Sequence, residues 1–346
     1  MARAGFNRRT ALATLTMTLA AEASDLDIVG YFKGPTFGFA HHRGITHTFV
    51  GIPFVAGFVL LVVWIIEILR RRFGNQEARA ARLRKRGLPV DPRWGLLYLF
   101  ALIAGLSHLL LDYTNNYGIR PFEPFSYRWY AWDTVFIYEP LLYVALIGGL
   151  VLPRLFALIN EEIGSKSRKP RGQVGAILAL LGVLAVWGVR AYEHQKAVSA
   201  LNARVYQGAD PLRVSAFAYP LNPFRWYGVA ETYDFYARVE VVNGEVDPLG
   251  QMTVRYKPQP SDATAAAQKT YLGRVFMDWA RYPLLETEAR DDGQRYDVQF
   301  IDMRFLYPGS TRGVLSPRVV LNDALKPVAV WWGQRSDPNA VTEDLR

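Results

Sequence analysis

Hydrophobic positions are distributed very unevenly along this chain. Its first part contains four long apolar runs, and a buried helix of a soluble protein would instead show a polar face. Each run approaches the roughly 20 apolar residues that a helix needs to cross a bilayer. The pattern therefore predicts four transmembrane helices, at Val50–Leu69, Trp94–Leu111, Pro140–Ile159 and Val174–Tyr192. A shorter Ala/Thr-rich stretch, Thr10–Glu22, precedes them.

Beyond Tyr192 the pattern changes to short β-rich runs separated by Gly, Asp and Pro turns. Strands are expected at residues 237–242, 252–256, 296–301 and 327–332, and Tyr271–Leu285 reads as an amphipathic helix among them. This composition predicts a small domain of about 140 residues. The expected fold class is an α-helical polytopic membrane domain, residues 1–193, followed by a small α+β extramembrane domain, residues 194–346.

The charges of the loops predict the orientation. The loop after the first run carries nine basic side chains and the loop after the third run carries four, and basic loops stay on the cytoplasmic side. They are Arg70, Arg71, Arg72, Arg79, Arg82, Arg84, Lys85, Arg86 and Arg93, then Lys166, Arg168, Lys169 and Arg171. We therefore expect a multi-pass inner (plasma) membrane protein, with residues 112–139 and everything after Tyr192 on the extracytoplasmic side.

The same loops account for most of the formal net charge of +9. A nucleic-acid partner is therefore not expected, whereas membrane lipids are. No G-x-x-x-x-G-K-[ST], G-x-G-x-x-G or G-x-S-x-G motif occurs, so nucleotide binding and a serine-hydrolase elbow have no support.

Candidate chemistry comes from histidines and aspartates near the ends of the apolar runs. The chain has no cysteine, so any metal must be held by nitrogen and oxygen atoms. Four of the five histidines lie in two clusters beside acidic residues, and imidazole with carboxylate is a ligand set for Zn, Mn or Fe(II). The metal ligands predicted in this way are Asp25, Asp27, His42, His47, His108 and Asp112.

Spacing and predicted topology support this site. His108 and Asp112 are four residues apart and share one helix face, and Asp25 and Asp27 point the same way if their backbone is extended. A loop at Arg43-Gly44 is expected to bring His42 and His47 together, with Arg43 available for a substrate anion. All six ligands fall on the outer face of the predicted topology. Each pair taken singly also fits a helix cap or an ordinary polar contact.

The segment 112–139 is rich in aromatic residues, and Trp129, Tyr130 and Trp132 fit an interfacial belt. That interpretation leaves its charged groups unexplained. Asp133 is a candidate further ligand, Arg120 and Arg128 are candidate phosphate contacts, and Asp133 or Glu123 is a candidate general base.

These motifs together resemble the YdjM family of inner-membrane proteins, described as membrane-bound metal-dependent hydrolases. The matching residues are Asp25 and Asp27, the H-R-G-x-T-H run from His42 to His47, G-x-x-S-H-x-x-x-D from Gly105 to Asp112, and Trp132-Asp133. The resemblance covers about the first 190 residues. Family members usually open with a T-H-x-x-x-G segment ahead of a sequence like residues 2–10. The resemblance thus implies either a further histidine upstream of Met1 or a reduced ligand set.

Two functions remain open at this point. The first is a membrane-bound metal-dependent hydrolase, with Zn as the first choice and Mn or Fe as alternatives, acting on a phosphoester or ester of a lipid or lipid-linked substrate at the outer face. The second is a non-enzymatic membrane scaffold or binding protein whose His/Asp cluster is structural. An enzyme needs an open coordination position, whereas a structural site is closed by protein ligands. A transporter is disfavoured because the ionisable groups lie at helix ends rather than at mid-membrane.

Overall fold

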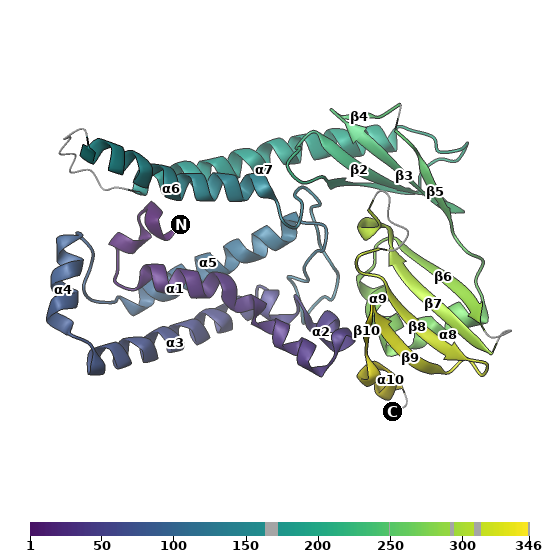
Figure 1. Ribbon diagram of the computed structural model, residues 1–346, viewed down its shortest axis with the longest axis horizontal. Helices are drawn as coiled ribbons and strands as arrows, with labels where there is room; N and C mark the ends of the chain where they lie inside the picture. The colour runs from purple at the N-terminus through teal and green to yellow at the C-terminus, as the bar shows by residue number, and fades with distance from the viewer. Residues whose placement is uncertain (163–171, 249, 291–293, 308–312, 345–346) are drawn as a thin grey trace. The chain divides into compact units, whose positions relative to one another are not determined.

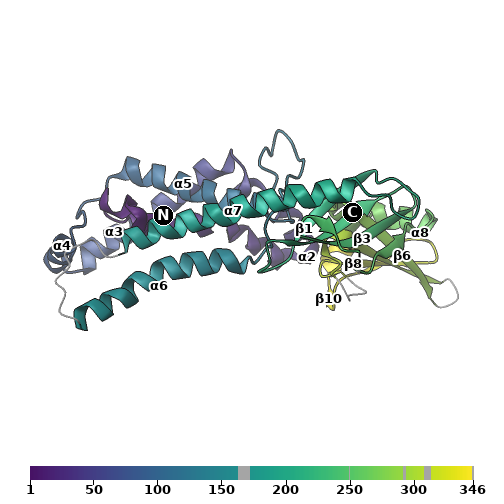
Figure 2. The same ribbon diagram turned by 90° about the horizontal axis from the view of Figure 1, so that it is seen from above.

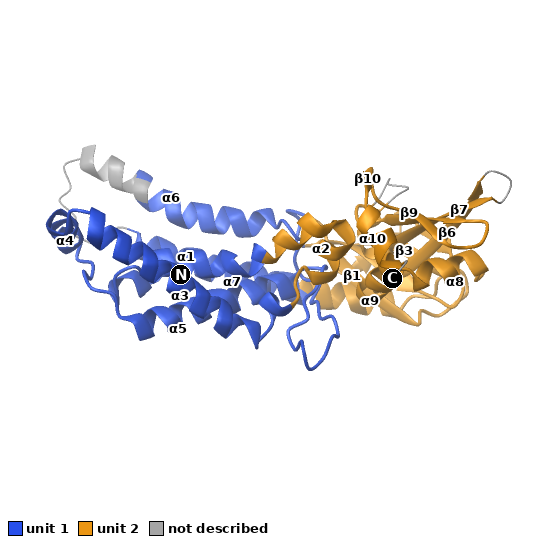
Figure 3. Cartoon of the chain, turned by 90° about the horizontal axis from the view of Figure 1, so that it is seen from below, with its two compact units in different colours: residues 1–26, 45–192, 220–223 blue, residues 27–44, 193–219, 224–346 orange. Residues whose placement is uncertain are grey.

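The structure is a computed structural model that describes residues 1–162, 172–248, 250–290, 294–307 and 313–344 (Figure 1). The chain divides into two compact units (Figure 3). The first contains residues 1–26, 45–192 and 220–223, and the second contains residues 27–44, 193–219 and 224–346. The basic residues Lys166, Arg168, Lys169 and Arg171 of the third predicted loop lie outside the described residues.

The first unit is helical. Its elements are η1 (Ala2–Ala4), η2 (Phe6–Arg8), α1 (Ala13–Glu22), the start of η3 (Ala23–Lys33), η4 (Ile45–His47), α3 (Gly51–Phe73), α4 (Gln76–Lys85), α5 (Trp94–Thr114), α6 (Pro140–Glu162) and most of α7 (Gln173–Asn202). Among the described residues α3, α5 and α7 are long and apolar enough to cross a membrane, and α6 is apolar from Pro140 to Pro153. The side chains of α6 at residue 154 and from residue 156 onward are outside the described set.

Small side chains bring α1, α3 and α5 close together. Ala13, Met17 and Ala20 of α1 pack with Ala56, Val59 and Val63 of α3 and with Leu97, Phe100, Ala101 and Ala104 of α5. Association of helices in lipid depends on such small residues, because lipid chains are as apolar as the helix surfaces and only close packing favours the contact. This three-helix core fixes the end of α5 relative to the start of α3, where the candidate chemistry lies.

Helices α6 and α7 run side by side, and small residues again allow the two helices to pack closely (Figures 1 and 2). A Cβ on Gly149 of α6 would lie 2.4 Å from the Cβ of Ala179 in α7, and one on Gly175 would lie 2.3 Å from Pro153. Near the other end of the pair, Arg190 of α7 forms a buried 2.6 Å ion pair with Glu139, the residue before α6. Packing and charge thus both join the two helices.

The second unit contains two antiparallel sheets. One has the order β1-β2-β3-β4 with β5 also paired to β3, from β1 (Arg213–Ala218), β2 (Arg225–Glu231), β3 (Phe235–Val242), β4 (Glu245–Val246) and β5 (Thr253–Tyr256). The other has the order β10-β9-β8-β7-β6, from β6 (Pro283–Arg290), β7 (Arg295–Asp302), β8 (Pro317–Asn322), β9 (Pro327–Trp332) and β10 (Arg335–Ser336). The helical elements are α2 (Pro35–His41), α8 (Asp262–Lys269), α9 (Tyr271–Trp279), η6 (Met303–Phe305) and α10 (Pro338–Asp344).

The core of this unit is aromatic, and buried residues of both sheets contribute to it. It contains Phe217, Tyr227, Val229, Tyr236, Tyr282, Leu284, Ile301, Met303 and Leu306. A helical membrane domain followed by a small domain of strands and short helices, the predicted class, is therefore confirmed.

One helix predicted in this region is wrong over its last six residues. We expected a helix from Tyr271 to Leu285, but α9 ends at Trp279, and Leu284 and Leu285 belong to strand β6. Pro283 explains the difference, since proline has no amide hydrogen for a helix interior and disfavours helical backbone in the residue before it. Leu284 and Leu285 are instead buried as sheet residues.

A segment from the beginning of the chain completes the second unit. Helix α2 contributes Phe39, whose ring lies 5.0 Å from that of Trp279 and 4.7 Å from that of Trp332. Thr36 donates its backbone N–H to Asp337 over 2.7 Å and accepts a hydrogen bond from the Trp332 indole over 3.0 Å. Residues 27–44 therefore belong with the sheets although they precede the long helices in sequence.

Candidate metal centre

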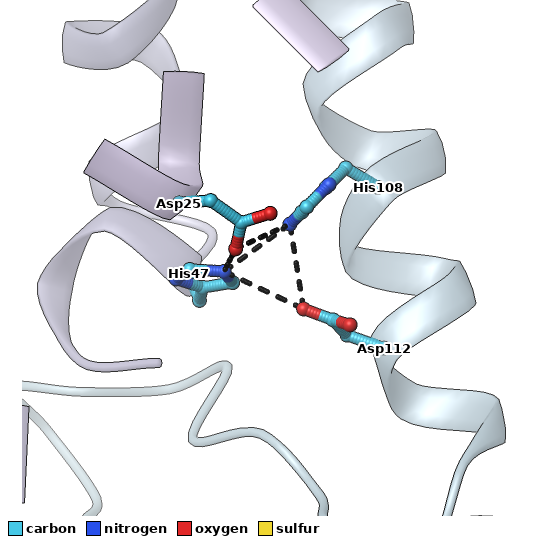
Figure 4. Close-up of side chains that lie close together, drawn as sticks. All are labelled: Asp25, His47, His108 and Asp112. Atoms are coloured by element: carbon cyan, nitrogen blue, oxygen red, sulfur yellow. Dashed lines mark hydrogen bonds and ion pairs between the residues drawn. The ribbon is translucent and has the colours of Figure 1, made fainter. Parts of the chain in front are cut away.

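Four side chains of the helical unit converge on one point (Figure 4). They are Asp25, His47, His108 and Asp112, and one nitrogen or oxygen atom from each lies within 4.8 Å of the others. The His47 Nε2 and His108 Nε2 atoms are 3.2 Å apart. Each Nε2 also lies 3.3–3.5 Å from Asp25 Oδ1 and 3.4 Å from Asp112 Oδ2.

These five distances match the edges of a metal coordination tetrahedron, and the sixth, between Asp25 and Asp112, is within 4.8 Å. Ligand atoms at 2.0–2.1 Å from a tetrahedral zinc ion lie about 3.3–3.4 Å from one another. A hydrogen-bonded network accounts for them less well, because one imidazole N–H points at one acceptor, whereas each Nε2 here faces three other polar atoms. Two imidazoles and two carboxylates also form a ligand set that a zinc, manganese or ferrous ion accepts. The four residues therefore fit a single divalent cation.

Helix α5 supplies two of the four groups. His108 and Asp112 are separated by one helical turn near its end, so both side chains leave the helix on the same face. Asp112 lies in the last turn, where the helix dipole disfavours a negative charge. A cation held between the two side chains offsets that cost.

His47 is positioned by a tight turn ahead of α3. The Thr48 hydroxyl donates to the Ile45 carbonyl over 2.9 Å and accepts the Gly51 N–H over 2.7 Å, which ties η4 to the first turn of α3. A Cβ on Gly51 would lie only 1.7 Å from the Ile45 carbonyl oxygen, so only glycine fits there. On the other side of the ring, the Thr46 hydroxyl lies 3.1 Å from His47 Nδ1 and leaves Nε2 directed at the cluster.

A second glycine lets the two ligand-bearing elements approach. A Cβ on Gly105 of α5 would lie 3.0 Å from Ile52 Cδ1 in the first turn of α3. Ile52 itself is buried with Leu109 and Ile119. The distance between His47 and His108 thus depends on the packing of Ile52 against α5.

The centre is buried on one side and open on the other. The His47 side chain is fully buried and those of His108 and Asp112 are 14% and 13% exposed, whereas that of Asp25 is 47% exposed. Hydrogen bonds from His108 and His47 hold the pKa of Asp25 well below its ordinary value, although partial burial opposes this. Asp25 is thus an ionised carboxylate at the solvent-facing edge.

The two other predicted ligands bind to each other in the second unit. Asp27 Oδ1 lies 3.0 Å from His42 Nδ1, and Asp27 Oδ2 accepts the Arg43 backbone N–H over 2.8 Å. Arg43 is 8% exposed and has a left-handed backbone, with φ of 56°. The turn at Arg43-Gly44 therefore places His42 against Asp27, and His47 against Asp25.

The predicted general bases follow α5. The Trp132 N–H donates to the Tyr113 carbonyl over 2.7 Å, and the Thr134 N–H donates to the Thr114 carbonyl over 2.9 Å. The residues before and after Asp133 are therefore both hydrogen-bonded to the end of α5. Asp133 is 5% exposed and has a φ of 60°. Glu123 lies instead 3.4 Å from Arg120 in an ion pair.

The predicted phosphate contacts have aromatic partners. The Arg120 guanidinium lies 4.7 Å from the Trp129 ring centre, and that of Arg128 lies 5.4 Å from the Tyr130 ring centre. Both arginines thus take part in cation–π contacts with the aromatic segment that we interpreted as an interfacial belt.

Sequence reasoning missed the residues that support the ligands: Thr46, Thr48, Gly51 and Gly105. Each of them lies within or beside a motif that we had noted only for its histidine. A threonine next to a ligand histidine and a glycine in the first turn of an apolar helix were the available signals, because each suggests a side-chain hydrogen bond or a close backbone approach.

Comparisons with known proteins identify the family of this chain. The model of the YdjM inner membrane protein family matches residues 1–197. The chain is also similar to the uncharacterized protein YfhP of Bacillus subtilis (strain 168), with 23% identity over 311 residues, which are 88% of this chain and 81% of that protein. No solved structure matches the chain significantly. Since the family match spans more than half of its residues and includes all four converging side chains, the chain belongs to the YdjM inner membrane protein family.

Proposed function

We propose that this protein is a membrane-bound metal-dependent hydrolase of phosphoesters or esters in lipids or lipid-linked molecules. The observation that carries the proposal is the convergence of His47, His108, Asp25 and Asp112, with five of their six ligand–ligand distances at tetrahedral spacing. A divalent ion at this point would polarise an ester or phosphoryl oxygen and lower the pKa of a water molecule. Zinc is the first choice for this ligand set, with manganese or iron as alternatives.

The unequal burial of the four ligands supports a catalytic role for the centre. His47, His108 and Asp112 form a buried group of three, the usual number of protein ligands at a catalytic zinc site. Asp25 occupies the fourth, half-exposed position, where a carboxylate can shift between one- and two-oxygen coordination or give way to substrate. Substrate would enter from the side of Asp25.

Asp133 is the general base that we propose. It is buried, it is attached through its neighbours to the end of α5, and its left-handed backbone is unusual for a residue other than glycine. Glu123 is a weaker choice because Arg120 already neutralises it. We propose, as the sequence suggested, that Arg43 binds the anionic group of the substrate.

A lipid substrate is supported by the side chains beside the ligands. Leu26, Phe49 and Leu111 lie next to or two residues from Asp25, His47 and Asp112, and they are 52%, 52% and 44% exposed. Exposed apolar side chains beside a polar centre fit the boundary between acyl chains and head groups. From the loop charges we further propose that the centre and the C-terminal domain face the extracytoplasmic side.

A structural metal staple is the alternative, and one observation favours it. Four protein ligands suffice to close a tetrahedral site and leave no position for substrate. The protein would then be a scaffold or binding protein. Hydrolysis by the metal-loaded protein separates the two functions, because only the hydrolase has a coordination position that substrate can reach.

The first experiment combines metal content with turnover. The protein, purified in detergent after growth with zinc, manganese and iron, is compared with His108→Ala and with His41→Ala, an exposed histidine whose ring lies against Phe37 of its own helix. We expect about one metal ion per chain in the wild type and in His41→Ala, and loss of both metal and lipid-ester hydrolysis in His108→Ala. Bound metal without hydrolysis of phospholipid or carboxyl-ester substrates would favour the staple, and no metal in any form would overturn both functions.

A further inference from the structure

A second charged feature lies at the opposite end of α3 from the candidate metal centre. Residues 70–93 hold nine basic and two acidic side chains, divided between the last turn of α3, helix α4 and the strand-free segment that follows. We call six of the exposed basic residues of this region the α3–α4 platform. They are Arg70, Arg72, Arg82, Arg84, Lys85 and Arg86.

A buried carboxylate organises the platform. Glu67 of α3 is 3% exposed, and it accepts hydrogen bonds from Arg71 Nε over 3.0 Å and from Arg79 Nη1 over 2.9 Å. Arg79 belongs to α4, so this carboxylate attaches α4 to the end of α3. Asn75 accepts the Ala78 N–H over 2.9 Å and caps the start of α4. As a result α4 crosses the end of α3 instead of continuing its direction (Figure 1).

The platform cations keep their charge exposed. Glu67 neutralises Arg71 and Arg79 only, and within the described part of the chain none of the six platform residues forms an ion pair with a carboxylate. Six exposed cations close together in sequence repel one another, which costs stability unless anions gather there. The positive-inside rule for membrane topology depends only on the number of basic residues in a loop. It therefore does not explain why a buried carboxylate fixes the position of α4.

The neighbouring side chains indicate which anion gathers there. Phe73, at the end of α3, is 78% exposed, and Leu69 and Ile68 in the preceding turn are 49% and 41% exposed. The guanidinium of Arg72 lies 5.8 Å from the Phe73 ring centre. Apolar side chains that lead directly into cations match the depth profile of a bilayer, with acyl chains followed by phosphate groups.

We propose that the α3–α4 platform binds the head groups of anionic phospholipids in the leaflet that borders this end of α3. Phosphate oxygens accept hydrogen bonds from Arg82, Arg84 and Lys85 while the acyl chains lie along the exposed apolar side of α3. Each cation near an anionic surface strengthens binding about fivefold, and the effect weakens as salt screens the charges. This inference is independent of the metal centre and of hydrolysis.

The test compares lipid retention by full-length variants in detergent. The variant Arg82→Gln/Arg84→Gln/Lys85→Gln removes three platform charges, and Lys269→Gln/Lys326→Gln/Arg335→Gln removes three exposed charges from the second unit as a matched control. Native mass spectrometry with equimolar phosphatidylglycerol and phosphatidylcholine measures the bound lipids. Melting temperatures verify that each variant is folded; we expect no decrease in either variant, and a slight increase in the platform variant because three mutually repelling charges are removed.

The expected result is selective retention of phosphatidylglycerol by the wild type and the control. The platform variant should lose that selectivity by at least tenfold, and Arg82→Lys/Arg84→Lys should keep most of it because charge is preserved. Equal retention of both lipids by the wild type would overturn the proposal, as would an unchanged platform variant or an equal loss in the control.

Discussion

His47 Nε2 and His108 Nε2 lie 3.2 Å apart, and the same two carboxylate oxygens, from Asp25 and Asp112, lie within 3.5 Å of both. The two histidines are 61 residues apart in the chain and come from different elements. Four ligand atoms that share one centre are more than a chain of hydrogen bonds requires, and they define where a cation would lie.

Thr46 should increase the affinity for the metal although it is not a ligand. Its hydroxyl lies 3.1 Å from His47 Nδ1, so Thr46→Val removes the group that orients the ring. Loss of such a partner typically weakens metal binding about 10- to 100-fold. Competition with a fluorescent zinc chelator measures the change, and Thr18→Val, an exposed threonine of α1, serves as control. Equal affinity in the two variants would mean that the hydroxyl does not orient His47.

Gly51 and Gly57 provide a matched pair in one helix. A Cβ at position 51 would meet the Ile45 carbonyl oxygen at 1.7 Å, whereas a Cβ at position 57 would meet no atom within 4 Å. Gly51→Ala should therefore displace η4 and His47, lower the metal content and destabilise the protein by about 1–3 kcal/mol. Gly57→Ala should leave metal content unchanged and stabilise the helix slightly. Metal analysis and thermal unfolding measure both effects, and a Gly51→Ala protein with full metal content would contradict the proposed turn.

The second unit should lose stability in acid through Asp302. Burial raises the pKa of this carboxyl, but the charge and hydrogen bonds of Arg304 and a backbone hydrogen bond from Arg281 outweigh burial and hold the pKa below its ordinary value. The unfolded chain, with an aspartate pKa of about 3.9, then binds more protons than the folded chain. This contribution is present above about pH 4 and is lost as pH falls through the folded pKa.

Asp302→Asn tests that pH dependence. At neutral pH the variant should be less stable by roughly 3–5 kcal/mol, because the Arg304 charge stays buried without its counter-ion. Below about pH 4 the wild type should lose more stability with each step in pH than the variant does. Denaturant unfolding followed by near-UV circular dichroism measures both, with the exposed Asp323→Asn as control. Parallel pH curves for wild type and Asp302→Asn would exclude this carboxylate as the source.

The Arg190–Glu139 ion pair should hold α6 and α7 together. Its atoms lie 2.6 Å apart, and both side chains are at most 1% exposed. Glu139→Gln leaves a buried guanidinium with only partial compensation and should cost roughly 3–5 kcal/mol, whereas Glu139→Leu combined with Arg190→Met should recover much of it. Melting temperatures in detergent measure the difference, beside Glu288→Gln at a 72% exposed carboxylate. A double variant as unstable as Glu139→Gln would show that the charge is not the cause.

The sequence by itself determined the long apolar helices and four of the strands. Contiguous apolar length is a local property, so the starts of α3, α5 and α7 were predicted to within one residue, although α7 continues to Asn202, beyond the predicted end at Tyr192. Residues 237–242 and 296–301 fall within β3 and β7. The ligand spacing in α5 was equally local, because His108 and Asp112 share a face in any α-helix. The family followed from the same motifs.

Only the tertiary structure decided which ligands meet. Asp25 and Asp27 are two residues apart, yet one joins His47 and His108 while the other binds His42, because the chain passes from one unit to the other between them. Tertiary packing also decided that Gly51 and Gly105 are required, since each accommodates an atom from another turn or helix. Distances between remote segments depend on the packing of the whole core, and no local pattern in the sequence encodes that packing.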